Sequence, residues 1–321
     1  MTGDVARDPA GPVLLFGARG WIGAMLQRIF EVDLNVPCIA ARSRAENAAD
    51  VFSEMTRLRP RLVFAALGRT HGVHEGRAFT TIDYLEQPGR LSENLRDNLV
   101  APVVLASTCQ RLGVPCAQIA TGCIFERTGA HEEAPRAGDE HGFSESDDPN
   151  FTGSSYSTVK GHTDLLLSQL FSETTLFFRI RMPLSHDLHP RSFLTKILRY
   201  DKVCSIPNSM SVLDGPRGLL SLFARMALAG MVGCYNGTNP GVMAHNDILR
   251  RYQQVVDADF EWKNFSEEEQ AHVLAARRSN NQLDSRKLQA AADALDFPLP
   301  TLPDAVEGIL QELATSARRA L

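Results

Sequence analysis

A tyrosine and a lysine four residues apart, Tyr156 and Lys160, head an apolar helical run. At this spacing both side chains project from the same face of a helix. A phenol is a poor acid at neutral pH because its ordinary pKa is about 10, and a nearby ammonium favours the phenolate. The pair therefore predicts a proton donor for a carbonyl oxygen whose carbon accepts hydride. On an exposed helix face the same spacing is more often an ordinary solvated pair.

A glycine-rich turn near the N-terminus predicts a dinucleotide site. It follows the apolar run 13–16, which we interpret as a buried strand, and precedes the helical pattern of Met25, Leu26, Ile29 and Phe30. Glycines let the backbone approach a pyrophosphate, and the helix N-terminus offers it free N–H groups. The alternative is a strand-to-helix turn without a ligand. The expected cofactor contacts in this turn are Gly17, Arg19, Gly20, Trp21, Ile22 and Gly23.

The residues after the second expected strand, 36–40, favour NADPH over NADH. A site for NADH would place Asp or Glu there, whereas this chain has Ala41-Arg42-Ser43-Arg44. Because an arginine holds a 2′-phosphate through paired N–H bonds, we expect Arg42, helped by Arg19, to bind NADPH. The alternative is that these are ordinary surface arginines.

Further strands are expected at 62–68, 116–120 and 175–181, with a helix over 91–112, a loop over 69–88 and another over 128–149. Alternating strands and helices predict an α/β fold, a Rossmann-type doubly wound parallel sheet. Ligands lie at the carboxyl ends of such strands, where this chain places the small residues Ala65 and Ala66 and the hydroxyl of Thr121. Asn98, in the 91–112 helix, is a further expected cofactor contact.

The composition changes after Pro183, which predicts a smaller C-terminal substrate lobe interwoven with the first domain. We expect an NADP-binding domain over 11–182, to which 205–238 returns through a helix at 219–229 and a strand at 234–238. The substrate-binding lobe would then comprise 183–204 and 239–321. Its expected helices cover 193–200 and 245–256, and Ser266 and Glu269 have the spacing of a capping box. The polar run 277–281 suits a nucleotide-sugar diphosphate or an ordinary surface loop.

Composition excludes several classes of partner. The 321 residues are 44% hydrophobic and 22% charged with a net charge of −5, so we expect no nucleic-acid partner. No secretory signal or membrane-crossing stretch is evident, which favours a cytoplasmic protein. The six cysteines are scattered without metal-ligand spacing, so we expect reduced, mostly buried thiols and no metal site.

Several longer peptides resemble the bifunctional nucleotide-rhamnose synthase family. These enzymes are extended short-chain dehydrogenase/reductases, relatives of the dTDP-4-dehydrorhamnose reductases, and act on UDP-4-keto-6-deoxy-glucose as 3,5-epimerases and 4-reductases. The resemblance covers most of the chain and is more specific than the glycine turn or the Tyr-Lys pair. The matching peptides are ATGCIFE (120–126), PNFTGSSYS (149–157), RMP (181–183), IPNSM (206–210), TNPG (238–241), FEWKNFSEEEQ (260–270) and RSNN (278–281).

The resemblance implies a two-stage reaction. The C4 ketone acidifies the hydrogens at C3 and C5, which Cys123 and Lys196 would exchange on opposite faces of the ring. NADPH would then reduce C4, with Tyr156 protonating the oxygen, Thr121 orienting the ketone, and Lys160 holding the nicotinamide ribose. Judged without the resemblance, Cys123 is an ordinary buried thiol and Lys196 a solvated helix residue. The implied substrate contacts are Arg181, Asn208, Asn239, Arg278 and Asn280.

Other readings stay open at this point. A 4,6-dehydratase carries Asp-Glu after the catalytic Thr, whereas this chain has Gly122-Cys123. A reductase-only dTDP-4-dehydrorhamnose reductase needs only the Thr, Tyr and Lys. A non-enzymatic alternative is an NADP-binding regulatory subunit, as in methionine adenosyltransferase. The stretch 69–87 matches the family poorly, which leaves UDP and dTDP both open. A homodimer is a further expectation.

Overall fold

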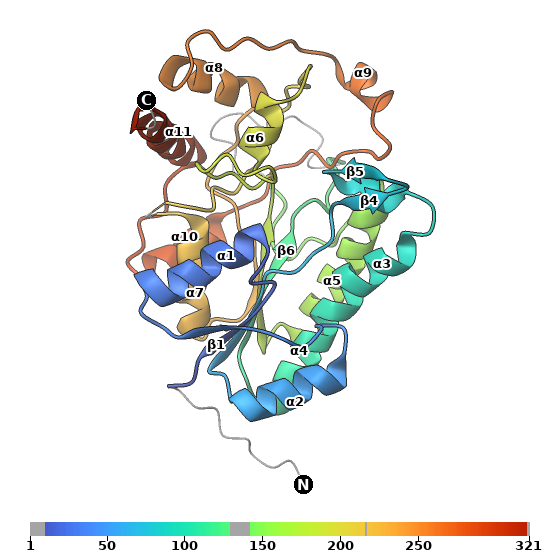
Figure 1. Ribbon diagram of the computed structural model, residues 1–321, viewed down its shortest axis with the longest axis vertical. Helices are drawn as coiled ribbons and strands as arrows, with labels where there is room; N and C mark the ends of the chain where they lie inside the picture. Colours follow the sequence, from blue (N-terminus) through green and yellow to red (C-terminus); the bar gives the residue numbers. More distant parts are fainter. Residues whose placement is uncertain (1–9, 129–141, 216, 320–321) are drawn as a thin grey trace. The chain divides into compact units, whose positions relative to one another are not determined.

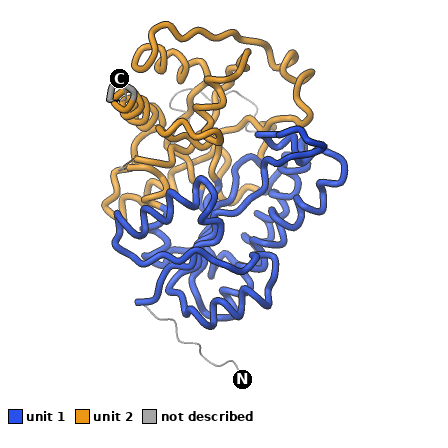
Figure 2. The backbone as a smooth tube through the Cα atoms, in the orientation of Figure 1, with its two compact units in different colours: residues 1–124, 148–179, 223–235 blue, residues 125–147, 180–222, 236–321 orange. Residues whose placement is uncertain are grey.

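The computed structural model describes residues 10–128, 142–215 and 217–319 (Figure 1). The backbone divides into two units that interleave along the chain (Figure 2). Unit 1 comprises Met1–Ile124, Asp148–Arg179 and Phe223–Tyr235, and unit 2 comprises Phe125–Asp147, Ile180–Leu222 and Asn236–Leu321. The bounds of these two units differ from those of the two lobes expected from the sequence. The cofactor-binding and substrate-binding roles of the expected lobes stay predictions.

Unit 1 contains a six-stranded sheet in the order β2-β1-β3-β6-β7-β8. β1 pairs in parallel with both β2 and β3, β3 pairs in parallel with β6, and β7 pairs in parallel with β8. The order reverses at β1, so the carboxyl ends of β1 and β3 flank a topological switch point. This arrangement confirms the predicted Rossmann-type sheet. The strands are β1 Val13–Phe16, β2 Cys38–Ala40, β3 Leu62–Ala65, β6 Cys116–Thr121, β7 Thr175–Ile180 and β8 Gly233–Tyr235.

Helices cover both faces of this sheet (Figure 1). One face carries α1 and the part of α7 that begins at Phe223, whose ring stacks on Phe178 with centroids 3.8 Å apart. The other face carries α2, α3, α4 and α5, and its apolar core joins Val51 and Leu105 to Val63 of β3. The helices are α1 Trp21–Arg28, followed by a π-helical turn Ile29–Asp33, α2 Ala48–Leu58, α3 Leu91–Leu95, α4 Ala101–Leu112, α5 Ser155–Phe171 and α7 Leu219–Leu228.

The helix expected over 91–112 is interrupted by a π-helical turn, Arg96–Val100, between α3 and α4. Pro102 has no backbone N–H and so cannot donate to the carbonyl of Asn98, its partner in a regular α-helix. The Asn98 carbonyl accepts a hydrogen bond from the Thr163 hydroxyl of α5, at 2.7 Å. This hydrogen bond joins the helix to α5.

The prediction of an irregular loop over 69–88 is wrong in part, because this segment contains a hairpin and a 3₁₀ helix. Strands β4 Gly72–His74 and β5 Arg77–Phe79 pair antiparallel, and the 3₁₀ turn covers Ile82–Glu86. The two residues between the strands, Glu75 and Gly76, both have positive φ, at 48° and 78°. Two such residues in succession form the turn that matches the twist of a hairpin. Glu75 stands where such a turn usually has Asn, Asp or Gly, which concealed the signal in the sequence.

The glycine turn is shaped by backbone contacts that leave no room for a Cβ atom. Gly17 has φ +81°, and a Cβ there would lie 2.4 Å from the carbonyl oxygen of Ala66. A Cβ on Gly23, in the first turns of α1, would lie 2.0 Å from the carbonyl oxygen of Gly17. The two glycines thus allow strand, turn and helix to approach closely, as a dinucleotide turn requires.

Unit 2 is built from helices and irregular chain around its own apolar core. Leu249 of α8 and Leu310 of α11 belong to this core. The predicted capping box of Ser266 and Glu269 is present. The expected strand at 234–238 ends earlier, since β8 stops at Tyr235. The helices are α6 Phe193–Leu198, α8 His245–Val255, α9 Glu267–Ala271, α10 Arg286–Asp293 and α11 Leu302–Arg319; the last two were not assigned from the sequence.

The ranges 10–128, 142–215 and 217–319 contain no candidate for a membrane span or a metal site. No helix in them is both long enough and apolar enough for a membrane span. No group of three His, Cys, Asp or Glu side chains in them is arranged to hold a metal ion. All six cysteines are free thiols, and all but Cys123 are buried. Most of the predicted loop over 128–149 lies outside the described residues.

We predict that Gly23→Ala lowers the free energy of unfolding by about 2 kcal/mol or more, because the new methyl group collides with the backbone of Gly17. Gly308→Ala in α11 is the matched control, since a Cβ there meets nothing within 4 Å. In a helix the control substitution should instead stabilise by about 1 kcal/mol. Urea unfolding of both variants checks this, and equal effects would contradict the packing argument.

Candidate active site

The cofactor side of unit 1 combines the glycine turn with two exposed arginines. The backbone N–H of Gly20 donates to the carbonyl of Gly17 at 2.8 Å, and α1 begins at the next residue. The first turn of α1 contains no acidic residue to oppose an anion. The Arg19 and Arg42 side chains are exposed and have no ion-pair partner among the described residues. These features fit a pyrophosphate at the helix and a further phosphate at the arginines.

Four of the predicted catalytic residues lie in unit 1. Thr121 ends β6, and its Oγ1 accepts a hydrogen bond from the backbone N–H of Cys123 at 3.1 Å. The Thr121 side chain also hydrogen-bonds Tyr156, the second residue of α5. Lys160 lies one turn further along α5, with its side chain 5% exposed. A phenol, a hydroxyl, a thiol and a buried amine therefore cluster where β6 ends and α5 begins.

Burial changes the acidity of both members of the Tyr-Lys pair. It is the largest of the effects that raise the pKa of Tyr156; the nearby Cys123 adds to the rise and the hydrogen bond with Thr121 opposes it. Burial also lowers the pKa of Lys160 to about 8, opposed by the negative charge of Asp164. Lys160 is not among the causes that shift the phenol pKa, and burial outweighs the one effect that lowers it. Tyr156 accordingly keeps its proton at neutral pH.

Asp164 continues the series of Tyr156 and Lys160 along α5, at the same spacing of four residues. Its carboxylate accepts two hydrogen bonds from the guanidinium of Arg179 in β7, at 2.9 and 2.5 Å. Both side chains are almost fully buried, at 3% and 1% exposed. This buried ion pair therefore anchors the helix that carries Lys160 to β7.

Two fully buried asparagines connect the chain after β3 to the start of α5. The amide of Asn98 accepts from the Arg69 N–H and donates to the Arg69 carbonyl, both at 2.9 Å. It also donates to Asn94, which in turn donates to the hydroxyl of Ser155 at 2.9 Å. Asn98 thus orders the backbone at Arg69, after the carboxyl end of β3. Its direct contact with the cofactor stays a prediction.

The first turn of α5 has its free N–H groups satisfied by side chains. Glu86 accepts from the N–H of Ser155 at 2.7 Å, and the Ser154 hydroxyl accepts from the N–H of Ser157 at 3.0 Å. A carboxylate and a hydroxyl at this position cap a helix and complement its dipole. They hold Tyr156, which lies between these two N–H groups, in a defined position.

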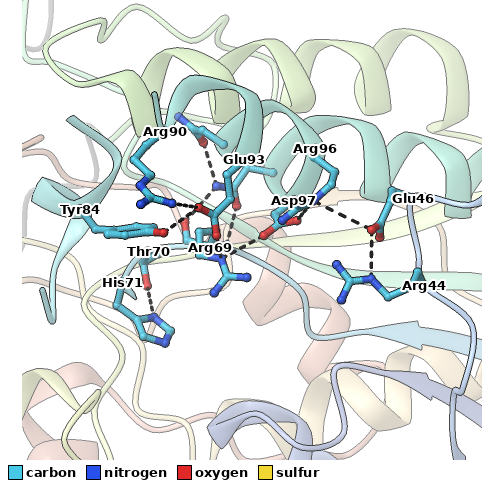
Figure 3. Close-up of polar contacts among 12 residues, drawn as sticks. Arg44, Glu46, Arg69, Thr70, His71, Tyr84, Arg90, Glu93, Arg96 and Asp97 are labelled. Atoms are coloured by element: carbon cyan, nitrogen blue, oxygen red, sulfur yellow. Dashed lines mark hydrogen bonds and ion pairs between the residues drawn. The ribbon is translucent and has the colours of Figure 1, made fainter. Parts of the chain in front are cut away.

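The charged residues around Arg69 neutralise one another (Figure 3). Its Nε lies 3.1 Å from Glu93 and 2.9 Å from Asp97. Arg44, at the end of the turn after β2, pairs with Glu46 at 3.0 Å (Figure 3). Because these arginines already have carboxylate partners, they order the loops that carry them. Arg42 and Arg19, by contrast, have no ion-pair partner among the residues that the structure describes.

Three of the predicted substrate motifs converge inside unit 2. The Arg181 guanidinium, fully buried, donates to Asn208 Oδ1 at 2.7 Å and to the Ser279 carbonyl at 2.9 Å. Asn208 also donates to Asn280 Oδ1 at 3.2 Å. The buried Arg181 and Asn208 therefore support the RSNN segment, whereas Asn280 and Arg278 are only partly buried.

Asn239 and Lys196 have different surroundings in unit 2. Asn239 is 1% exposed, and its amide accepts from the Val212 N–H at 2.9 Å and donates to the Pro300 carbonyl at 3.2 Å. This indicates a structural role, and its predicted contact with substrate is untested. Lys196 lies in α6 and is partly buried.

Comparisons with known proteins agree over nearly the whole chain. L780 of Acanthamoeba polyphaga mimivirus, described as uncharacterized, is 42% identical over 296 residues, 92% of this chain and 95% of that protein. A bifunctional dTDP-4-dehydrorhamnose 3,5-epimerase/dTDP-4-dehydrorhamnose reductase of Arabidopsis thaliana is 41% identical over 277 residues, 86% of each chain. The chain belongs to the bifunctional nucleotide-rhamnose synthase family.

A solved structure in the nucleotide-rhamnose synthase family supports the same assignment. The crystal structure of the L780 UDP-rhamnose synthase from Acanthamoeba polyphaga mimivirus matches with a TM-score of 0.85 at 40% identity, covering 94% of this chain and 99% of that one. This structure and the two relatives confirm the family resemblance inferred from the motifs. No model of a known protein family matches the chain.

Several residues that support this synthase-family site were not found from the sequence. Asp164 lies one turn after Lys160 on α5 and is paired with Arg179. Asn94 and Glu86 hold the start of α5, and Glu54 contacts the turn after β2. The four-residue spacing of Asp164 from Lys160 was a usable signal. The others meet their partners only through the fold.

We predict that Lys160→Met stabilises the protein at pH 7 by on the order of 3 kcal/mol, because it removes a buried charge. Folding lowers the pKa of Lys160 from its ordinary 10.5 to about 8. Between these values the unfolded chain keeps a proton that the folded chain loses, so the stability of the wild type rises with pH. Below about pH 8 the cost of burial is fully present.

Urea unfolding of wild type and variant at pH 7 and pH 10.5 measures this difference, which should shrink at the higher pH. Lys263→Met, at an exposed position, is the matched control and should change neither value. A Lys160→Met variant that is less stable than the wild type at pH 7 would contradict the prediction.

We predict that Asn239→Ala and Asn280→Ala separate structure from binding. Asn239→Ala leaves a buried N–H and a partly buried carbonyl without this partner, which should cost about 1–3 kcal/mol of stability without changing the KM for the sugar. Asn280→Ala should raise that KM and change stability little. Thermal unfolding and steady-state kinetics check both, and a raised KM for folded Asn239→Ala would assign it to the binding site.

Proposed function

We propose that the chain converts UDP-4-keto-6-deoxy-D-glucose to UDP-L-rhamnose as an NADPH-dependent 3,5-epimerase/4-reductase. The observation that carries the proposal is the cluster of Thr121, Cys123, Tyr156 and Lys160 in a member of this family. UDP is preferred over dTDP because a solved relative at 40% identity is described as a UDP-rhamnose synthase. The cytoplasmic location and the homodimer remain predictions.

In the reduction, Tyr156 is the proton donor. Its raised pKa keeps the phenol protonated, so it can form the new O–H bond at C4 as its own O–H bond breaks. The Thr121 hydroxyl, hydrogen-bonded to the same phenol, orients the ketone oxygen. The Lys160 ammonium stabilises the phenolate that remains until solvent returns the proton. Bound NADPH supplies the hydride that C4 receives.

In the epimerisation, Cys123 is one of two groups that exchange protons at C3 and C5. The ketone at C4 acidifies both positions, and inversion requires removal of a proton from one face and its return on the other. Cys123 is the only cysteine of the chain that is not buried, and it lies close enough to Tyr156 to affect its pKa. Lys196 of α6 is the proposed second group, as the family resemblance implies.

The alternatives carry less support. A reductase-only enzyme has no need of a partly exposed thiol two residues after Thr121. The Arabidopsis thaliana relative, which covers 86% of this chain, is named for both epimerase and reductase activity. A non-catalytic NADP-binding subunit has no need of the proton donor and the buried lysine together.

We predict that Tyr156→Phe and Cys123→Ser separate the two activities. Each variant is mixed with UDP-4-keto-6-deoxy-D-glucose in deuterated water, with and without NADPH, and followed by nicotinamide absorbance and NMR. Tyr156→Phe should lower reduction by about 10²-fold or more while deuterium still enters C3 and C5. Cys123→Ser should stop this entry and still bind NADPH. The dTDP sugar, run in parallel with the wild type, tests nucleotide preference.

Two outcomes would overturn the proposal. Deuterium entry at the normal rate in Cys123→Ser would remove the epimerase assignment and leave a reductase. Wild-type protein that binds NADPH but neither oxidises it nor exchanges protons, with either nucleotide, would favour the regulatory subunit. Cys109→Ser, which changes a fully buried thiol, is the matched control and should keep both activities.

A further inference from the structure

The turn after β2 is held by a carboxylate from the next helix. Glu54 of α2 accepts from the Arg42 N–H at 3.0 Å, from the Ser43 N–H at 2.8 Å and from the Ser43 hydroxyl at 2.6 Å. Its side chain is 7% exposed. Although burial raises the pKa of Glu54, its hydrogen bonds with Ser43 and Arg42 prevail and lower it. The carboxylate is therefore ionised and fully engaged with the turn.

This contact decides which groups of the turn remain free for an anion. The N–H groups of Arg42 and Ser43 are both occupied by Glu54, so neither backbone group is free for a phosphate. Arg44 is engaged by Glu46 (Figure 3). The exposed side chain of Arg42 therefore remains, on a backbone whose conformation Glu54 determines.

A carboxylate near this turn has two opposite effects on cofactor choice. Free to face a ribose, it would bind hydroxyls and repel a 2′-phosphate, as the acidic residue of an NADH site does. Turned to the backbone, as Glu54 is, it is unavailable to the ribose and orders the turn that carries Arg42. Its hydrogen bonds involve a charged acceptor, and these are stronger than those between neutral groups.

We propose that Glu54 is a positioning residue that sets the preference for a 2′-phosphorylated cofactor by holding Arg42 in place. The inference rests on the proposed function only in that the cofactor is NADPH. Glu54 acts through the turn and need not touch the cofactor itself. Its substitution therefore affects NADPH through Arg42 and leaves NADH, which lacks the phosphate, largely unaffected.

Binding of NADPH and NADH to the full chain, without sugar, tests this by nicotinamide fluorescence, with 2′,5′-ADP as a competing probe. Glu54→Gln places an amide N–H₂ against the donors of the turn, so we expect NADPH binding weakened about tenfold and NADH binding within about twofold. Asp50→Asn is the matched control, because it removes an exposed carboxylate one turn earlier on α2 and should change neither. Arg42→Ala should weaken NADPH alone.

A double-mutant cycle separates positioning from a general effect on the fold. In the Arg42→Ala background, Glu54→Gln should add little further loss, since the group that it positions is gone. The inference would be overturned if Glu54→Gln weakened NADPH and NADH binding equally, or if it bound NADPH more tightly. It would also be overturned if the losses of NADPH affinity in Glu54→Gln and Arg42→Ala added up in the double variant.

Two further results complete the test. Glu54→Asp keeps the charge but shortens the side chain, so it should weaken NADPH in the same direction; wild-type binding would overturn the inference. If Glu54→Gln does not fold, Glu54→Asp replaces it as the test of the inference. A wild-type protein without preference for NADPH would instead remove the cofactor assignment in the proposed function, whereas preference retained in Glu54→Gln removes only the role of Glu54.

Discussion

The buried charge of Lys160 is the constraint around which the candidate active site is arranged. An ammonium removed from water costs free energy, and the fall of its pKa to about 8 expresses that cost. Asp164, one turn further along α5, opposes the fall, and its carboxylate accepts hydrogen bonds from Arg179. The same low-polarity surroundings hold the proton on Tyr156. The same environment thus keeps Tyr156 protonated and places the Lys160 ammonium near it, where the ammonium can stabilise the phenolate formed in the reaction.

Such an arrangement depends on the exact placement of one helix. The start of α5 is fixed by Asn94 and Glu86, which come from two different segments of unit 1. Its middle is fixed by Thr163, whose hydroxyl donates a hydrogen bond to the carbonyl of Asn98. The Thr163 hydrogen bond joins buried groups and the other two are partly buried, so breaking them costs more than breaking exposed ones. The rigidity of α5 therefore comes from polar contacts as much as from its apolar face.

The residues of the proposed reaction are divided between the two units of the chain. Unit 1 holds the reductive set and Cys123, and unit 2 holds Lys196 and the buried cluster around Arg181. Within unit 2, the buried Arg181 and Asn208 hold the RSNN segment through hydrogen bonds. A sequence motif alone does not distinguish this supporting role from contact with a ligand. A matched motif therefore identifies a region that matters, while burial and hydrogen bonding indicate how each residue contributes.

The sequence by itself determined the features that are local or repeated along the chain. The strands, the glycine turn, the Tyr156–Lys160 spacing and the family peptides all lie within short segments, and the parallel sheet follows from their alternation. Only the tertiary structure decided the contacts of Glu54, Asn94 and Glu86, because their partners lie 11, 61 and 69 residues away along the chain. It also decided the direction of the Tyr156 pKa, since burial depends on everything packed around a group and spacing records only its neighbours on one helix.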